Sequence, residues 1–190
     1  IHLGHDRGAD EVAQAAIQED AHAVAITSYQ GGAVEMFTHT KQLLDAAGFE
    51  HVFLCGGGGG TILPQEIRLL RDKGIARIYS PDDGRSMGLT GMVEDAMETA
   101  AKIDLLDDAR YASLNQPIDA SDHGAVAKLL TLAENGEEDL YRMILESTRS
   151  RSKDDKCPVI GLTGTGGAGK SSLTDELMLR IQRDNPGLRI

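Results

Sequence analysis

The sequence predicts an α/β fold built around a parallel β-sheet. Short apolar runs alternate with helical patterns over residues 1–103, glycine-rich loops follow several of those runs, and a phosphate-binding loop lies near the end of the chain. Strands that alternate with helices of this length are typical of parallel sheets with crossover helices. Aromatic residues make up only 4% of the chain, so aliphatic side chains must build the core.

The predicted strands are short runs rich in Val, Ile, Leu or Ala, a composition typical of buried parallel sheets. In chain order they occupy 1–3, 22–28, 51–55 and 76–80. A further run at 158–163 directly precedes the phosphate-binding loop and is predicted to be the first strand of a second domain.

The predicted helices show apolar side chains at helical spacing and are bounded by proline and glycine. The helices at 34–47 and 64–73 each end at a glycine, and the second of them begins with a proline. In the helix at 86–103, apolar residues such as Leu89 and Val93 recur at helical spacing. The complete set is 10–19, 34–47, 64–73, 86–103, 122–134 and 137–149, with a further helix from residue 172.

Asp, Asn and Pro residues interrupt the alternation at 104–121, and a charged run follows at 150–156. We therefore expect three parts: an α/β domain at 1–104, a linker of two polar-faced helices at 105–156, and the start of a second domain at 157–190. The chain does not begin with Met, and both of its ends have strand-like sequence. It is therefore expected to be an internal segment of a longer protein.

Residues 164–171 match the full phosphate-binding motif G-x-x-x-x-G-K-[ST] between an apolar run and a helical pattern. Glycines let consecutive backbone N–H groups surround phosphate oxygens, and the N-terminus of the following helix adds partial positive charge. Lys170 is expected to reach the outer phosphates and Ser171 to bind Mg²⁺. The predicted nucleotide-binding residues are Gly164, Gly166, Gly167, Ala168, Gly169, Lys170, Ser171 and Ser172.

Glycine-rich loops follow the predicted strands at 22–28 and 51–55, at the edge where open parallel sheets bind ligands. The second loop contains five consecutive glycines, 56–60, whose ordering costs much conformational entropy. Such a run is expected where a bulky ligand approaches the backbone, and a flexible loop tip is the alternative interpretation.

Four stretches together resemble the cobalamin-binding domain of adenosylcobalamin-dependent acyl-CoA mutases: 11–16, 22–28, 55–57 and 63–67. The resemblance covers about residues 1–104. With the long glycine run and the later phosphate-binding loop, the chain is similar to one branch of this family, in which an isobutyryl-CoA mutase is fused to an inserted GTPase chaperone. This resemblance implies a flavodoxin-like first domain whose first strand precedes residue 1.

The resemblance also implies that the nucleotide tail of the cofactor is buried in the first domain, beside a serine and a Gly-Gly pair. Ser28 takes the serine position, and Gly57 and Gly58 fall in the Gly-Gly region. The family's S-x-L pattern becomes Ser28-Tyr29-Gln30 here, so its apolar third position is lost.

In this family a histidine from a D-x-H-x-x-G loop binds the cobalt, and residues 3–8 nearly match that loop with His5 in the histidine position. The leading Asp, which orients the histidine in the family, is Leu3 here. Only one predicted helix separates His5 from the strand that ends at Ser28, whereas the family places a further strand and helix between them. We therefore expect the cobalt-binding histidine to lie upstream of residue 1.

For the parent protein, the resemblance implies interconversion of isobutyryl-CoA and n-butyryl-CoA by homolysis of a cobalt–carbon bond, with a GTPase that gates cofactor loading. It implies adenosylcobalamin, GTP and Mg²⁺ as cofactors, an acyl-CoA substrate bound outside this segment, and a homodimer. No residue of this segment is expected to be catalytic in the mutase step. Two alternatives stay open: a methylmalonyl-CoA mutase-like enzyme, and a cobalamin-binding carrier or regulatory module beside a phosphate-loop NTPase.

Composition narrows the class of protein further. A net charge of −11 argues against a nucleic-acid-binding surface, which needs clustered Lys and Arg. Two cysteines form no disulfide or metal pattern, no apolar run reaches membrane-spanning length and no signal peptide is visible, so a cytoplasmic location is expected. Ser28 and Cys55 stand where a phosphotransfer receiver domain needs acidic residues, which disfavours that class.

Overall fold

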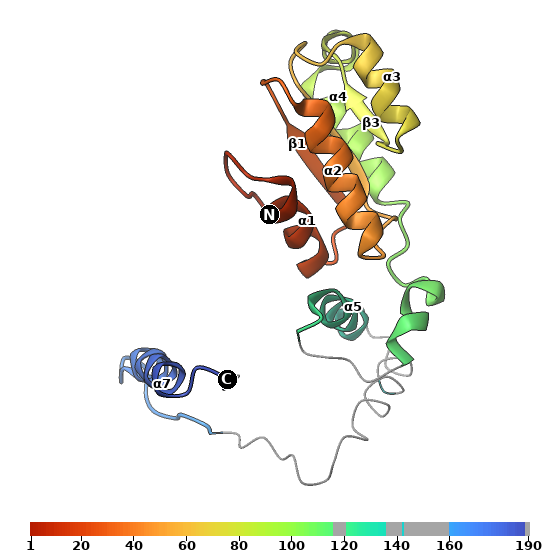
Figure 1. Cartoon of the computed structure of the whole chain (residues 1–190). Coiled ribbons are helices and arrows are strands. Elements are labelled where there is room, and N and C mark those ends of the chain that lie inside the picture. The colour runs from red at the N-terminus through yellow and green to blue at the C-terminus, as the bar shows by residue number, and fades with distance from the viewer. Residues whose placement is uncertain (116–120, 136–141, 143–159, 189–190) are drawn as a thin grey trace. The chain divides into compact units, whose positions relative to one another are not determined.

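The computed structural model describes residues 1–115, 121–135, 142 and 160–188, and the chain divides into two compact units, 1–150 and 151–190. The first unit contains a three-stranded parallel sheet with the order β1-β2-β3 (Figure 1). Its strands are β1 (Ala23–Thr27), β2 (Phe53–Gly57) and β3 (Arg77–Tyr79). The predicted α/β fold class with a parallel sheet is thereby confirmed.

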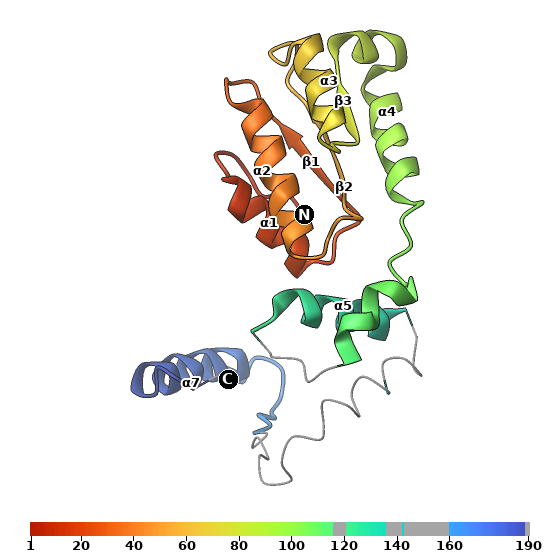
Figure 2. The same cartoon turned by 45° about the vertical axis from the view of Figure 1, so that its right-hand side comes forward.

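Helices connect these strands and cover both faces of the sheet. Figure 2 shows α4 on one face and α1 and α2 on the other. The first unit contains α1 (Ala9–Gln18), α2 (Ala33–Ala46), α3 (Pro64–Asp72), α4 (Pro81–Ala100), the 3₁₀ helix η1 (Asp108–Asn115) and α5 (His123–Glu134). The second unit contains α7 (Lys170–Asp184).

The strand register assigns each side chain to one face of the sheet. Thr27 lies opposite Gly57, which lies opposite Tyr79, so these residues share a face. We call it the α4 face, because Asp95 of α4 accepts a hydrogen bond of 2.8 Å from the Tyr79 hydroxyl and pairs with Arg77 Nε at 3.2 Å.

The opposite face carries the main hydrophobic core. Ile26 and Leu54 pack there with Phe37 of α2 and Leu70 of α3, and Phe37 and Leu70 are fully buried. Burial of large apolar side chains such as these stabilises a fold by roughly 1.5–3 kcal/mol each. The α2 and α3 helices are therefore fixed firmly against the three strands.

Two predicted strands are not present in the structure. Residues 1–3 and the described residues 160–163 have no strand partner among the described parts of the chain. An extended apolar run becomes a strand only where a neighbour accepts its backbone hydrogen bonds, so composition alone was misleading at both places. The predicted helix at 137–149 lies outside the described residues, apart from residue 142, which is helical.

The helix predicted at 86–103 begins earlier, and some of its apolar side chains are exposed to solvent. It starts at Pro81 after the N-cap Ser80, and Gly88 interrupts its helical geometry with φ 68°. Leu89 is 74% exposed and Val93 is 49% exposed, because α4 contacts the sheet through the polar Asp95 side of the helix. The apolar spacing therefore predicts the helix correctly, but it does not show which of these side chains are buried.

The helix α5 is not polar-faced as predicted, because one of its faces packs on the sheet unit. Leu132 is fully buried, and Lys128 places its ammonium over the Phe49 ring at 4.9 Å from the centroid. Thr131 donates a hydrogen bond of 2.8 Å to the Asp20 carboxylate in the turn after α1. The described part of the region following residue 104 thus shares a buried interface with the sheet unit.

The polar centre of this interface consists of Asp20, His51, Arg110, Lys128 and Thr131, which we call the Asp20 cluster. Arg110 Nη2 lies 2.5 Å from the Asp20 carboxylate and 3.1 Å from His51 Nε2. Asp20 is only 2% exposed, so its charge depends on these partners rather than on water. These contacts hold η1 and α5 against α1 and the start of β2.

The Asp20 cluster makes the stability of the first unit dependent on pH. Burial and the adjacent Arg110 guanidinium lower the pKa of His51 from 6.5 to about 4. Between these two values the unfolded chain binds a proton that the folded chain does not, so stability is full above pH 6.5 and falls as the pH decreases toward 4.

We expect the urea midpoint of unfolding to decrease as the pH falls over this range. His51→Gln should make the midpoint less dependent on pH. An unchanged pH slope in that variant would contradict this assignment.

Candidate functional site

The structure brings together the three residues predicted to bind the cofactor tail, at the carboxyl edge of the sheet. The Ser28 backbone N–H donates to the Gly57 carbonyl at 3.0 Å, which places Ser28 beside the end of β2. The Thr61 hydroxyl lies 2.7 Å from the Gly58 carbonyl and 3.2 Å from the Ser28 carbonyl, and it joins the two loops. Thr61 was not predicted as a site residue, although its position directly after the glycine run was a usable signal.

The glycines of the run are required by the packing of the protein itself. A Cβ atom at Gly56 would lie 1.9 Å from the Ile26 carbonyl oxygen, and one at Gly58 would lie 2.4 Å from the Ser28 carbonyl oxygen. Gly59 and Gly60 have φ of +56° and +99°, a conformation that other residues rarely adopt. The sequence predicted that a ligand approaches this backbone closely. In the structure, neighbouring strands and loops of the protein itself make such an approach.

The α4 face of β1 is exposed to solvent next to these loops. Ala25 and Thr27 are exposed on that face, and Gly57 adds no side chain beside them. The Ser28 hydroxyl has only a long contact of 3.5 Å, to the Gln30 carbonyl, so it can bond a ligand without losing a strong partner. These features leave both a polar group and an apolar surface accessible at this edge of the sheet.

Polar side chains at the end of β3 form hydrogen bonds with one another and stabilise this edge of the sheet. The Asp83 carboxylate accepts hydrogen bonds from the Ser80 backbone N–H at 2.8 Å and hydroxyl at 2.6 Å, which closes the N-terminus of α4. The Ser80 hydroxyl, followed by the backbone N–H groups, lowers the pKa of Asp83. Burial and the Asp95 hydrogen bond raise the pKa of Tyr79 to about 12, so its hydroxyl stays a donor.

Cys55, directly before the glycine run, is a structural residue. It is buried, and burial raises the pKa of its thiol to about 11. The thiolate is therefore scarce at neutral pH, and the residue is a poor nucleophile or metal ligand.

The phosphate-binding loop lies in the second unit, where it leads directly into α7. Gly167 and Gly169 both have φ of +77°, and Gly169 is the N-cap of the helix. Nothing lies within 4 Å of a Cβ built at Gly166, Gly167 or Gly169, so the surface of the loop is open. The loop thus offers accessible backbone N–H groups at a helix N-terminus, as an anion site requires.

The polar side chains at the end of this loop make few contacts that a ligand would have to replace. Lys170 Nζ donates a hydrogen bond of 2.7 Å to the Thr165 carbonyl, across the loop. Within the described residues, the hydroxyls of Ser171 and Ser172 have no hydrogen-bond partner, which leaves them available to a metal ion or a phosphate. The predicted nucleotide-binding residues 164 and 166–172 therefore lie in one stretch of the chain, where all are exposed except the half-buried Lys170.

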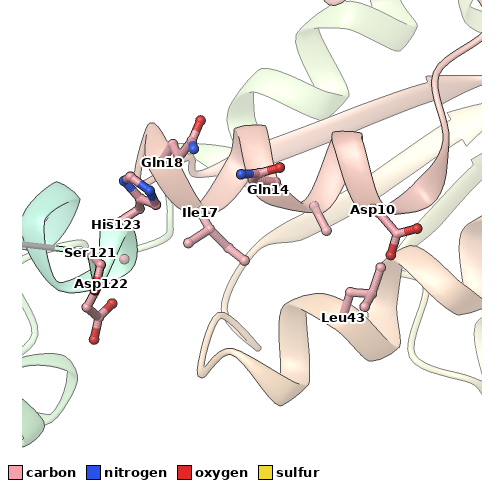
Figure 3. A pocket seen from close by; sticks show the side chains of 10 residues that line it. Asp10, Gln14, Ile17, Gln18, Leu43, Ser121, Asp122 and His123 are labelled. Carbon is pink, nitrogen blue, oxygen red and sulfur yellow. The ribbon is translucent and has the colours of Figure 1, made fainter. Parts of the chain in front are cut away.

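A separate groove of about 340 Å³ lies between α1 and the beginning of α5 (Figure 3). Its floor is apolar, with Ile17 and Leu43, and Asp10, Gln14 and His123 stand around it. None of the predicted cofactor or nucleotide residues lines this groove. Sequence reasoning placed His123 at an element end, and its position in the groove comes from the packing of α5 on α1.

Two negative findings apply to the residues that the structure describes. No group of three or more His, Cys, Asp or Glu side chains is arranged to hold a metal ion there. No helix in the same residues has the length and apolar character needed to cross a membrane.

Comparison with known proteins identifies relatives along almost the entire chain, although no family model matches it. Over 185 residues it is 50% identical to the fused isobutyryl-CoA mutase of Cupriavidus metallidurans, which covers 97% of this chain and 16% of that protein. Over 195 residues it is 43% identical to the fused isobutyryl-CoA mutase of Geobacillus kaustophilus, which covers 100% of this chain and 18% of that protein. The chain matches one segment of the fused isobutyryl-CoA mutases.

The match to the fused isobutyryl-CoA mutases includes both candidate sites in a single alignment, whereas a shorter match reaches less of the chain. The methylmalonyl-CoA mutase of Escherichia coli is 32% identical over 72 residues, or 38% of this chain and 10% of that protein. The chain spans only 16% and 18% of the two longer relatives, so most of their length lies beyond this segment. The resemblance predicted from the sequence motifs is confirmed.

Proposed function

We propose that this chain is the segment of an adenosylcobalamin-dependent acyl-CoA mutase that joins its cofactor domain to a nucleotide-binding chaperone domain. Residues 1–104 bind the cofactor, 105–156 link the domains, and 157–190 begin a GTPase. The observation that carries this proposal is the similarity to fused isobutyryl-CoA mutases across 97% to 100% of the chain, which includes both candidate sites in the same sequence order. The parent enzyme interconverts isobutyryl-CoA and n-butyryl-CoA, acts in the cytoplasm and forms a homodimer.

The first unit positions and shields the cofactor, whose cobalt–carbon bond supplies the radical chemistry. Ser28 hydrogen-bonds the nucleotide tail, Gly57 leaves the sheet edge next to the tail without a side chain, and Gly58 allows the two loops that hold the tail to approach each other closely. The acyl-CoA substrate binds outside this segment, and the cobalt-binding histidine lies upstream of residue 1. A methylmalonyl-CoA mutase-like activity is the second candidate, favoured only by the 38% of the chain that resembles that enzyme.

The phosphate-binding loop binds GTP with Mg²⁺, and nucleotide binding gates loading of the cofactor. Backbone N–H groups of 166–169 surround the phosphates, Lys170 turns from the Thr165 carbonyl to the outer phosphates, and Ser171 binds Mg²⁺. The base-recognition residues lie outside this segment. Support for this assignment is the open loop geometry at the N-terminus of α7.

Lys170→Ala in the full-length enzyme is expected to weaken nucleotide binding by about 100-fold or more, because a charge-assisted contact to phosphate is lost. Titration with a fluorescent GTP analogue measures this, and competition with ATP tests the choice of base. Cobalamin binding, followed by its absorbance, should not change. The control is Arg180→Ala, which removes only an exposed ion pair with Glu176 on the same helix.

Loss of cobalamin affinity in Lys170→Ala would argue against two separable sites. Equal displacement of the analogue by ATP would overturn the assignment of GTP. Absence of isobutyryl-CoA turnover by the cofactor-loaded full-length enzyme would overturn the proposed activity itself.

A further inference from the structure

The exposed aromatic ring of Tyr29 stands at the candidate cofactor site between the two glycine-rich loops. It is 68% exposed, although large aromatic side chains are usually much more buried. Its backbone follows Ser28 directly at the end of β1. The ring is therefore placed at the functional edge of the sheet without a role in the hydrophobic core.

One part of the Tyr29 ring is braced by the glycine run. A Cβ atom at Gly59 would lie 2.6 Å from Tyr29 Cε1 and 3.2 Å from Cδ1, so the ring rests directly against the Gly59 backbone. Thr61 joins the same two loops through the Ser28 carbonyl. The ring is thus held in place by a neighbouring loop while most of its surface stays in solvent.

The polar end of Tyr29 is also available. No described residue forms a hydrogen bond with its hydroxyl. Fixed aromatic rings with a free face bind planar groups by stacking, and a free phenol adds a donor for a phosphate or amide oxygen. The nucleotide tail of cobalamin carries both a planar aromatic base and a phosphate.

We propose that Tyr29 is a further cofactor-binding residue, whose ring, braced by Gly59, stacks on the aromatic base of the nucleotide tail. This inference rests on the proposed function, since it assumes cobalamin as the ligand. It also accounts for the departure from S-x-L: the apolar surface lost at Gln30 is supplied by Tyr29, one position earlier. The arrangement fits the exposed α4 face of β1, which Ala25 and Thr27 leave open.

The test compares cobalamin with cobinamide, which lacks the nucleotide tail, on the full-length enzyme. Tyr29→Ala is expected to weaken cobalamin binding about 5- to 100-fold, the range for loss of one aromatic–base stack. It should leave cobinamide binding unchanged. Tyr29→Phe keeps the ring and should retain most of the affinity, whereas Tyr29→Leu should behave like the alanine variant.

Gly59→Ala provides a second variant, because its Cβ would displace the ring. Since Gly59 has a φ of +56°, the same substitution is also made in the Tyr29→Ala background, where only its effect on the backbone remains. We expect Gly59→Ala alone to weaken cobalamin binding and spare cobinamide. Unchanged cobalamin binding in Tyr29→Ala, or an equal loss for both ligands, would overturn the stacking assignment. Failure of the wild-type enzyme to bind cobalamin would overturn the proposed function and this inference with it, and it is distinguished by the wild-type titration alone.

Discussion

Gly56→Ala is expected to open the sheet and to destabilise the first unit by about 3 kcal/mol or more. The added Cβ would lie 1.9 Å from the Ile26 carbonyl oxygen and 2.8 Å from Phe37 Cζ. The first of these atoms is backbone of the adjacent strand, so no side-chain rotation can relieve the clash. β1 and β2 must move apart, and the contacts of Phe37 in the main core are weakened.

Cys55 provides the measurement, because it is buried directly before Gly56. With Cys157 replaced by serine, the rate of Cys55 modification by a thiol reagent reports opening of the sheet. A loss of about 3 kcal/mol accelerates modification about a hundredfold when opening precedes the reaction. The rate for Gly56→Ala should rise by this order.

Two further glycines serve as graded controls for this prediction. Gly57→Ala would meet the Tyr79 carbonyl oxygen at 2.9 Å, a milder clash, and should show an intermediate rate. Gly31→Ala meets nothing within 4 Å and should label like the wild type. Equal rates for Gly56→Ala and Gly31→Ala would show that the glycine run is not required by strand packing.

The order of strands and helices could be predicted because each depends on a local pattern. The apolar runs at β1, β2 and β3 and the terminal glycines of the helices are signals within a few residues of one another. The early start of α4 was also readable, since Ser80 and Asp83 form an S-x-x-D capping box. It was missed because the apolar spacing after Ser86 was given more weight than the cap.

The purpose of the glycine run was only partly predictable. Its position at the sheet edge followed from the strand pattern, but the need for glycine at Gly56 and Gly58 arises from carbonyl oxygens of β1 and its loop. Those contacts depend on the parallel register, which no local signal specifies. The position of Tyr29 against Gly59 was unpredictable for the same reason, because this contact joins two separate loops.

The Asp20 cluster was beyond the reach of sequence reasoning. Arg110 and Thr131 lie 90 and 111 residues from Asp20 in the sequence, and each sits in a region that reads as a polar linker. Nothing local distinguishes Asp20 from the other acidic residues of an acidic chain. Only the packing of η1 and α5 on the sheet unit reveals that its carboxylate is buried.

Asp20→Asn is expected to destabilise the first unit by about 3 kcal/mol, because it leaves Arg110 and Lys128 buried without their anion. Lys128 already has a lowered pKa, owing to burial and to the nearby Arg110 charge. Asn tolerates the positive φ of 43° at this position, so the substitution tests the charge and not the backbone. Urea unfolding at pH 7, followed by Cys55 labelling, measures the change.

An exposed ion pair and a double variant separate this effect from a general loss of charge. Asp82→Asn breaks the surface pair with Arg85, where both side chains are more than 70% exposed, and should cost less than about 0.5 kcal/mol. Arg110→Met alone should destabilise the first unit, because it leaves the buried Asp20 carboxylate without its guanidinium partner. The double variant Asp20→Asn/Arg110→Met should lose less free energy of unfolding than the two single variants together. Both charges are then removed, so neither is left buried without the other. Additive losses would show that Asp20 and Arg110 act independently, and that the docking of η1 and α5 relies on apolar contacts such as Leu132.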